Sequence, residues 1–154
     1  MKHSKTSITL PLIMAAIHIV RMPANAQTTN LSGLWSGTTL VTPCDFAVGS
    51  RCNAQNNITL TLRQQDNQIA GSYTCATGTM VCRNGGADNT GNVQWGRISG
   101  NLIRLSLIIP ADVSNCYYNG ILTSPNAMHG TYMCFNGGAL VEEGTWDVKR
   151  SSGQ

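Results

Sequence analysis

The stretch "LSGLWSGTTL", Leu31 to Leu40, places a tryptophan between two glycines at the start of a series of short alternating segments. Further along the chain, "ITLTLRQ" from Ile58 and "IRLSLII" from Ile103 alternate apolar and polar residues cleanly. Such alternation over four to eight residues is typical of a β-strand that buries one face. Helical periodicity is not sustained in any window of useful length. The sequence therefore predicts an all-β fold.

Turn residues divide the chain into short candidate strands that follow one another closely. Between Ile98 and Leu102 only Ser99-Gly100-Asn101 intervene, enough for a hairpin and too little for a crossover. A meander of about eight strands removes its edges by closing on itself, so we expect a single antiparallel up-and-down β-barrel. The candidate strands are Gly33–Val41, Asn57–Gln64, Gln68–Cys75, Thr79–Arg83, Gly91–Ser99, Leu102–Ile109, Asn115–Leu122, Ala127–Cys134 and Gly144–Arg150.

Residues 1–26 have the pattern of a secretory signal peptide. Two lysines precede an apolar run over residues 8–20, and the small residues Ala24-Asn25-Ala26 provide an A-x-A cleavage site. The apolar run is shorter than the roughly 20 residues that span a bilayer. We expect residues 27–154 to form one secreted or periplasmic domain, with no membrane attachment after cleavage. Because Arg21 is unusual near a cleavage site, an uncleaved interfacial anchor is the alternative.

Removal of this leader balances the charge of the chain. Three of the ten basic residues lie in the leader, whereas all seven acidic residues follow it, so the mature chain has a formal net charge of zero. Nucleic-acid binding depends on a basic face that contacts phosphates. The remaining arginines are scattered singly, and nucleic acid is not expected as a partner.

All six cysteines follow the leader, which predicts a disulfide framework in an exported protein. There is no C-x-x-C pair, so a thiol redox site is not predicted. His129 is the only histidine after the leader, so a metal site is not predicted either, and no cofactor is expected. A hairpin centred on Pro125 would place Cys116 opposite Cys134. Of the fifteen possible pairings, we predict Cys44–Cys52, Cys75–Cys82 and Cys116–Cys134.

Two segments of the chain repeat one motif. "NQIAGSYTC" (67–75) and "NAMHGTYMC" (126–134) share the pattern N-x-[IM]-x-G-[ST]-Y-x-C. An internal duplication would produce this repeat, and so would similar hairpins in any up-and-down sheet. Both explanations stay open from the sequence alone.

The triplet Gly33-Leu34-Trp35 resembles the G-x-W of the first strand in lipocalins, fatty-acid-binding proteins and avidins, which together form the calycin barrels. This resemblance implies that a basic residue on the last strand packs across the tryptophan and closes one end of the barrel. Strand alternation places Trp146, Val148 and Arg150 on one face, so Arg150 is the predicted partner of Trp35. Gly33, Trp35 and Arg150 are therefore expected to be structural.

The chain is most similar in size to the avidins, and the resemblance implies a small-ligand site at one end of the barrel. Ser36 stands where an avidin-like site has an asparagine, so no particular ligand is carried over. The residues at corresponding positions are Trp35, Ser36, Ser72, Tyr73, Trp95 and Trp146.

Aromatic residues expected to face inward could line a ligand cavity, with Arg97 or Arg104 as a polar anchor. The alternative is that the same side chains fill the core of a small barrel. These aromatic residues are Trp35, Tyr73, Trp95, Tyr118, Tyr132 and Trp146.

Catalysis is not expected. His129 is interpreted as a surface residue, and Glu142-Glu143 as a solvated loop, so no acid–base pair or nucleophile can be assembled. The sequence therefore predicts a non-catalytic, exported barrel whose ligand enters near Trp35 and Tyr73. The alternative is a disulfide-stapled barrel that acts through the loop Cys44–Cys52 on another extracytoplasmic protein, as an inhibitor of a secreted hydrolase or as an adhesion module. The oligomeric state is not predicted.

Overall fold

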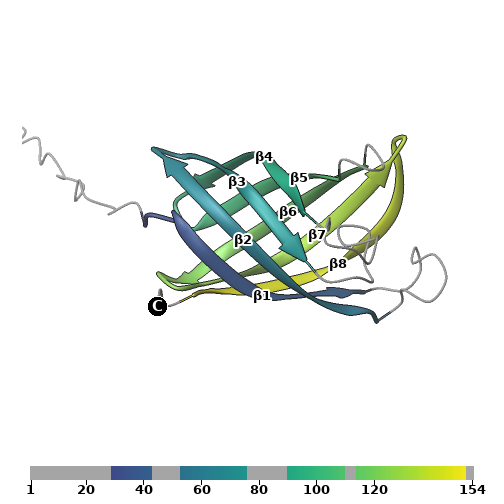
Figure 1. Cartoon of the computed structure of the whole chain (residues 1–154), viewed down its shortest axis with the longest axis horizontal. Coiled ribbons are helices and arrows are strands. Elements are labelled where there is room, and N and C mark those ends of the chain that lie inside the picture. The colour runs from purple at the N-terminus through teal and green to yellow at the C-terminus, as the bar shows by residue number, and fades with distance from the viewer. Residues whose placement is uncertain (1–28, 43–52, 76–89, 110–113, 152–154) are drawn as a thin grey trace, which may run out of the picture.

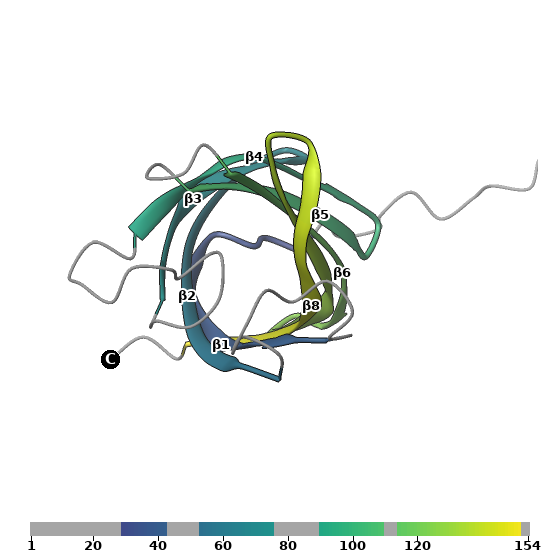
Figure 2. The same ribbon diagram turned by 90° about the vertical axis from the view of Figure 1, so that its right-hand side faces the viewer.

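Eight antiparallel strands close into a barrel in the computed structural model, which describes residues 29–42, 53–75, 90–109 and 114–151 (Figure 1). Each strand pairs with the next, and the last pairs with the first, which confirms the predicted fold class. Viewed from one end, the strands form a ring (Figure 2). The strands are β1 (Gly33–Val41), β2 (Gln55–Gln65), β3 (Gln68–Cys75), β4 (Thr90–Ser99), β5 (Leu102–Ile109), β6 (Ser114–Ser124), β7 (Ala127–Asn136) and β8 (Ala139–Arg150).

Most strand boundaries agree with the alternation of the sequence. β1, β3 and β5 have the predicted bounds. β4 and β7 extend the prediction at one end, and β2 and β6 at both ends, by one or two residues each. β8 differs, because it begins at Ala139 and not at Gly144. The interpretation of Glu142 and Glu143 as a solvated loop is therefore wrong. The predicted strand Thr79–Arg83 lies outside the described residues.

The two ends of the barrel differ in their connections. Tight two-residue turns at residues 66–67, 100–101 and 125–126 join β2 to β3, β4 to β5 and β6 to β7 at one end, called here the turn end. At the opposite loop end, Gly137 and Gly138 join β7 to β8 with φ angles of 56° and 85°. Positive φ at both central residues is the conformation of a type I′ hairpin turn, which glycine adopts without steric cost.

The hairpin of β6 and β7 has the register predicted from the sequence. Tyr118 lies opposite Tyr132, and Cys116 lies opposite Cys134. The two cysteines form a disulfide, which confirms that predicted bond. A bridge that closes a loop of this length stabilises the fold by about 3 kcal/mol. Cys75 is also disulfide-bonded, and its predicted partner Cys82 and the pair Cys44–Cys52 lie outside the described residues.

Inward-facing glycines allow neighbouring strands to approach each other closely. A Cβ atom at Gly37, Gly71, Gly130 or Gly144 would collide with a backbone carbonyl oxygen of the adjacent strand. Glycine within a strand permits the sharp local bending that a small closed barrel requires. These four positions therefore set the curvature of the wall.

Trp35 and Arg150 close the turn end of the barrel. The Trp35 side chain is fully buried, and its Nε1 donates a hydrogen bond of 2.9 Å to the Leu31 carbonyl oxygen. The guanidinium carbon of Arg150 lies 4.4 Å from the centre of the indole ring, a favourable cation–π arrangement. Arg150 also donates from Nη1 to the Ser32 carbonyl and from Nη2 to the Asn30 carbonyl. The ligand entry that the sequence suggested beside Trp35 is closed.

Candidate functional site

The interior of the barrel is apolar at the turn end and polar toward the loop end. Residues that fill the turn end include Leu31, Trp35, Leu62, Ile69, Ile98, Ile103, Met128 and Val148. Four buried polar residues, Thr39, Asn56, Ser114 and Glu142, lie at inward-facing positions in the half of the barrel next to the loop end. Burial of polar groups is unfavourable unless they are hydrogen-bonded. This concentration of polar side chains marks the loop end as the candidate site.

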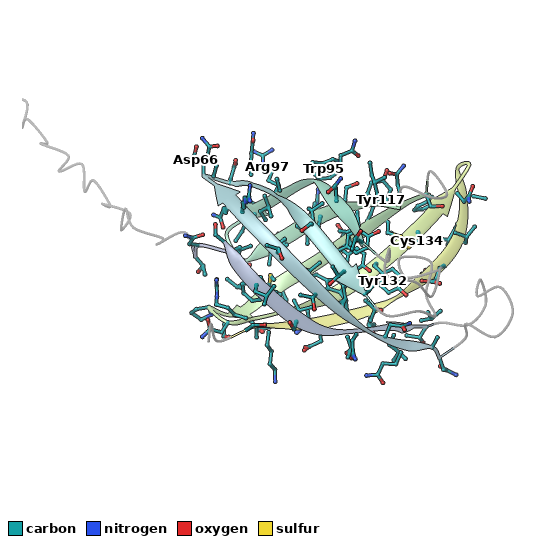
Figure 3. The ribbon with its side chains drawn as sticks, viewed as in Figure 1. Asp66, Trp95, Arg97, Tyr117, Tyr132 and Cys134 are labelled. Atoms are coloured by element: carbon teal, nitrogen blue, oxygen red, sulfur yellow. A yellow bond between two sulfur atoms is a disulfide. The ribbon has the colours of Figure 1, made fainter. Side chains whose placement is uncertain are left out.

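Three aromatic rings form the wall of this site. Tyr118 and Tyr132 are stacked, with ring centres 5.1 Å apart and ring planes 14° from parallel. Trp146 meets Tyr118 edge to face at 5.7 Å. All three side chains are buried. Together with Tyr73 and Glu142 they are called here the tyrosine cluster, and the position of Tyr132 on β7 is seen in Figure 3.

The tyrosine rings of the repeated motif occupy equivalent positions. Tyr73 on β3 lies opposite Gly91 on β4, and a Cβ atom at Gly91 would collide with the Tyr73 ring. Tyr132 on β7 lies opposite Gly144 on β8, and a Cβ atom at Gly144 would meet the Tyr132 ring in the same way. Each ring therefore lies against the wall in the space that a side chain on the next strand would need. The repeat in the sequence is a structural repeat of one tyrosine–glycine pair.

Hydrogen bonding in the cluster is incomplete. Tyr132 Oη donates to Glu142 Oε1 over 3.0 Å, and Tyr73 Oη donates to the Ile108 carbonyl oxygen over 3.1 Å. By contrast, three hydroxyl oxygens among the described residues are buried without a hydrogen-bond partner: Thr39 Oγ1, Ser114 Oγ and Tyr118 Oη. An unpaired buried group costs about 1–3 kcal/mol and is rare in folded proteins. These three oxygens are therefore the buried hydroxyls, among the described residues, that the fold itself leaves without a partner.

Burial raises the pKa of two phenols in the cluster. Burial raises the pKa of Tyr73 to about 12. Burial, assisted by the negative charge of Glu142 and by Tyr73, raises the pKa of Tyr118 well above its ordinary value. Both phenols therefore stay protonated well into the alkaline range.

The raised pKa of Tyr73 predicts a loss of stability in alkali. The unfolded phenol has a pKa near 10, so the unfolded state releases its proton first. This contribution to stability is complete below pH 10 and is lost as the pH rises toward 12. We expect the midpoint of urea unfolding to fall over this range, and to fall less in Tyr73→Phe. If Tyr73→Phe showed the same pH dependence as the wild type, this ionisation would not be its cause.

The structure brings together only part of the predicted ligand-binding set. Tyr73, Tyr132 and Trp146 lie in the cluster, whereas Trp35 is buried at the turn end and Ser36 is exposed. Ser72, Arg97 and Arg104 are exposed on the outer face, so neither arginine is the expected polar anchor of the interior. Gly33, expected to be structural, lies at the start of β1 with a φ of 132°, where an added Cβ would be 3.0 Å from Arg150 Nη1.

Trp95 does not face inward, and the predicted orientation is wrong. Its side chain is 48% exposed. A β-bulge in β4 is the cause: Val93 pairs with Leu107 and Trp95 with Ser106, which leaves Gln94 as an extra residue. Gln94 and Trp95 consequently both point outward. Strict alternation from an inward Val93 would place Trp95 inward but would turn the apolar Ile98 outward. This conflict between Trp95 and Ile98 is the signal in the sequence that the strand contains a bulge.

The described residues were also compared with the requirements of a histidine site, a metal site and a membrane-spanning helix. His129 is exposed on the outer face of β7. In the described segments no group of three or more histidine, cysteine or acidic side chains is placed to hold a metal ion. The same segments contain no helix of the length and apolarity needed to cross a membrane.

Comparison with known proteins shows the fold and no family. No protein-family model matches the chain, and no curated protein matches it. Among solved structures it is similar to a redesigned beta barrel, with a TM-score of 0.54 and 11% identity over 79% of this chain and 92% of that one. It is also similar to EF1p2_mFAP2b bound to DFHBI, with a TM-score of 0.55 and 10% identity over 79% of this chain and 94% of that one. At these identities the likeness extends to the barrel alone.

Proposed function

We propose that this protein is an exported, non-catalytic β-barrel that binds a small ligand inside its loop end. The observation that carries the proposal is the group of three buried, unpaired hydroxyls, Thr39, Ser114 and Tyr118, in the loop-end half of the barrel that holds the stacked tyrosines. A bound molecule that bonds these hydroxyls would remove their desolvation cost. The site has the usual composition of a small-molecule pocket, namely aromatic walls with a few placed polar groups.

The chemistry of the cluster indicates the class of ligand. Stacked phenol rings offer a flat apolar wall on which the body of a small molecule can pack. Hydroxyl groups both donate and accept hydrogen bonds, so the ligand needs at least one polar group of either kind. A compact, ring-containing molecule with hydrogen-bonding substituents meets both conditions. The similar barrel EF1p2_mFAP2b holds the small molecule DFHBI, which is compatible with this use of the fold.

Export and membership of the calycin barrels belong to the same proposal. The Cys116–Cys134 disulfide is consistent with an oxidising compartment outside the cytoplasm, in line with the signal-like residues 1–26. The packing of Arg150 on Trp35 is the arrangement that the calycin resemblance implies. The alternative function, action through the loop Cys44–Cys52, depends on residues outside the described structure.

The proposal is tested by removing single hydroxyls. Thermal-shift screening of a metabolite library against the purified protein should identify a stabilising ligand. Tyr118→Phe and Ser114→Ala should then weaken its binding by about tenfold each, because each removes one hydrogen bond to it. Without ligand, both variants should be as stable as the wild type or slightly more stable, since each loses an unpaired buried hydroxyl.

Tyr73→Phe is the matched control for this experiment. Its hydroxyl already bonds the Ile108 carbonyl, so its removal should lower the free energy of unfolding by about 1 kcal/mol. If Tyr118→Phe is destabilised as much as Tyr73→Phe, the Tyr118 hydroxyl has a partner within the protein and the proposed site is wrong. The same conclusion follows if the ligand binds equally well to Tyr118→Phe, Ser114→Ala and the wild type.

A further inference from the structure

A recess lies on the outside of the barrel, away from the interior cluster. It is a groove of about 780 Å³ over β2, β3 and β4, beside the turn that joins β2 to β3. Its volume is within the range of small-molecule sites, about 300–1,000 Å³. The side chains used in the following argument are Arg63, Gln65, Gln68, Gln94, Trp95 and Arg97, and all six are exposed. Figure 3 shows Trp95 and Arg97 on the same side of the barrel.

Trp95 provides a flat apolar surface in this groove. The bulge at Gln94 turns the indole outward, although an unbroken alternation would bury it. Bulges commonly re-aim a side chain beside a functional site. An exposed indole ring has a negative face that attracts weakly positive C–H groups. Trp95 is therefore suited to stacking against a ring that is edged with C–H groups.

Positive charge is concentrated on this side of the barrel. Arg63 and Arg97 both line the groove, and Arg104 on β5 lies directly opposite Arg97. Like charges directly opposite each other in a sheet are destabilising. Of the described acidic residues that are not buried, Asp66 lies in the β2–β3 turn beside the groove, whereas Glu143 and Asp147 are on β8, which is not adjacent to β2, β3, β4 or β5. Among the described residues, three arginines (Arg63, Arg97 and Arg104) stand against the single carboxylate of Asp66 on this side of the barrel, and this excess of positive charge favours an anionic ligand.

Neutral amides account for much of the remaining polar lining. Gln65, Gln68 and Gln94 each offer two N–H donors and a carbonyl acceptor. Such groups pair well with hydroxyls, which also donate and accept. A phosphodiester chain would instead require several cationic contacts along its length. The mixture of two arginines, three glutamines and one tryptophan favours a ligand rich in hydroxyls with a single acidic substituent per ring.

We propose that this groove binds an acidic saccharide. A sugar ring stacks on Trp95, its hydroxyls bond the glutamine amides, and its carboxylate or sulfate is held by Arg63 and Arg97. Guanidinium groups bind carboxylate and sulfate oxygens through paired, charge-assisted hydrogen bonds. The site is separate from the tyrosine cluster and does not depend on the interior ligand.

Calorimetric titration with four probes tests the assignment. Trigalacturonate carries carboxylates, a heparin-derived tetrasaccharide carries sulfates as well, maltotriose is uncharged, and an oligothymidylate represents nucleic acid. We expect saturable binding of at least one acidic saccharide, weaker binding of maltotriose by about tenfold or more, and weakening of the acidic interaction by added salt. Failure of both acidic saccharides to bind, or equal or tighter binding of the oligothymidylate, would overturn the proposal.

Variants separate the parts of the groove. Trp95→Ala should weaken binding of every saccharide by about tenfold, because all of them lose the stacking surface. The double variant Arg63→Gln/Arg97→Gln should remove the preference for acidic over uncharged saccharides. Leu102→Ala alters an equally exposed outer-face residue that does not line the groove, and it should bind as the wild type does. Unchanged binding by Trp95→Ala would contradict the proposal, since that exposed side chain can be removed without unfolding the barrel.

Discussion

Trp35→Ala should lower the free energy of unfolding by about 4 kcal/mol, the range observed when a large buried aromatic side chain is truncated. The indole is fully buried, donates a hydrogen bond to the Leu31 carbonyl and lies under the Arg150 guanidinium. Its removal leaves a void at the turn end and withdraws two polar contacts at once. Urea denaturation followed by circular dichroism measures the effect. Trp35→Phe, which keeps most of the ring volume, should lose about 1–2 kcal/mol.

Trp95→Ala is the matched control, because it removes the same side chain from the outer face. It should change the free energy of unfolding by less than about 1 kcal/mol. A ligand held at the loop end should bind Trp35→Phe as tightly as the wild type. A Trp35→Phe protein that kept its melting temperature but lost the ligand would show that Trp35 serves in binding and not in closing the barrel.

Gly130→Ala should destabilise the barrel by about 3 kcal/mol or more, or prevent folding, because the added methyl group has no room. Its Cβ would collide with the Asn119 carbonyl oxygen and the Gly120 Cα on β6. Both obstacles are backbone atoms, so the clash cannot be relieved by a change of rotamer. The two strands would have to separate where β6 and β7 are paired. The midpoint of urea unfolding and the yield of folded protein both report the effect.

Gly100→Ala separates this steric effect from the general effect of replacing glycine. Gly100 has a φ of 60°, and a Cβ atom added there would meet no other side chain or strand within 4 Å. The substitution should therefore lose only the roughly 1–2 kcal/mol that a left-handed conformation costs an L-residue. Similar losses at Gly100 and Gly130 would indicate that strand proximity at Gly130 is not limiting.

Local sequence signals predicted most of the strands and one register. The turn at Pro125 and Asn126 fixes the pairing of β6 with β7, and a hairpin register follows from its turn because the side-chain period is two residues. This is why the position of Cys116 opposite Cys134 could be inferred. The prediction placed Trp95 on the wrong face because Gln94 is an extra residue in β4. After such a bulge, every later side chain of the strand points to the opposite face from the one that alternation predicts.

The polar part of the candidate site was less accessible to prediction. Alternation and aromatic content identified Tyr118, Tyr132 and Trp146 as inward-facing. Glu142 was missed because adjacent glutamates suggest a solvated segment, and its burial depends on a hydrogen bond from Tyr132 on another strand. The unpaired state of Thr39 Oγ1 depends on where neighbouring side chains lie in three dimensions, which residue spacing does not encode.

The pairing of β1 with β8 has a kinetic consequence. Every other pairing in the barrel joins strands that are consecutive in the chain, so those pairings close much shorter loops. By contrast, Ser36 on β1 and Ser151, directly after β8, are hydrogen-bonded through their hydroxyls and lie 115 residues apart in the chain. Closing so long a loop has a larger entropic cost, and contacts of long sequence separation slow folding. We therefore expect the pairing of β1 with β8 to be the slowest step in closing the barrel.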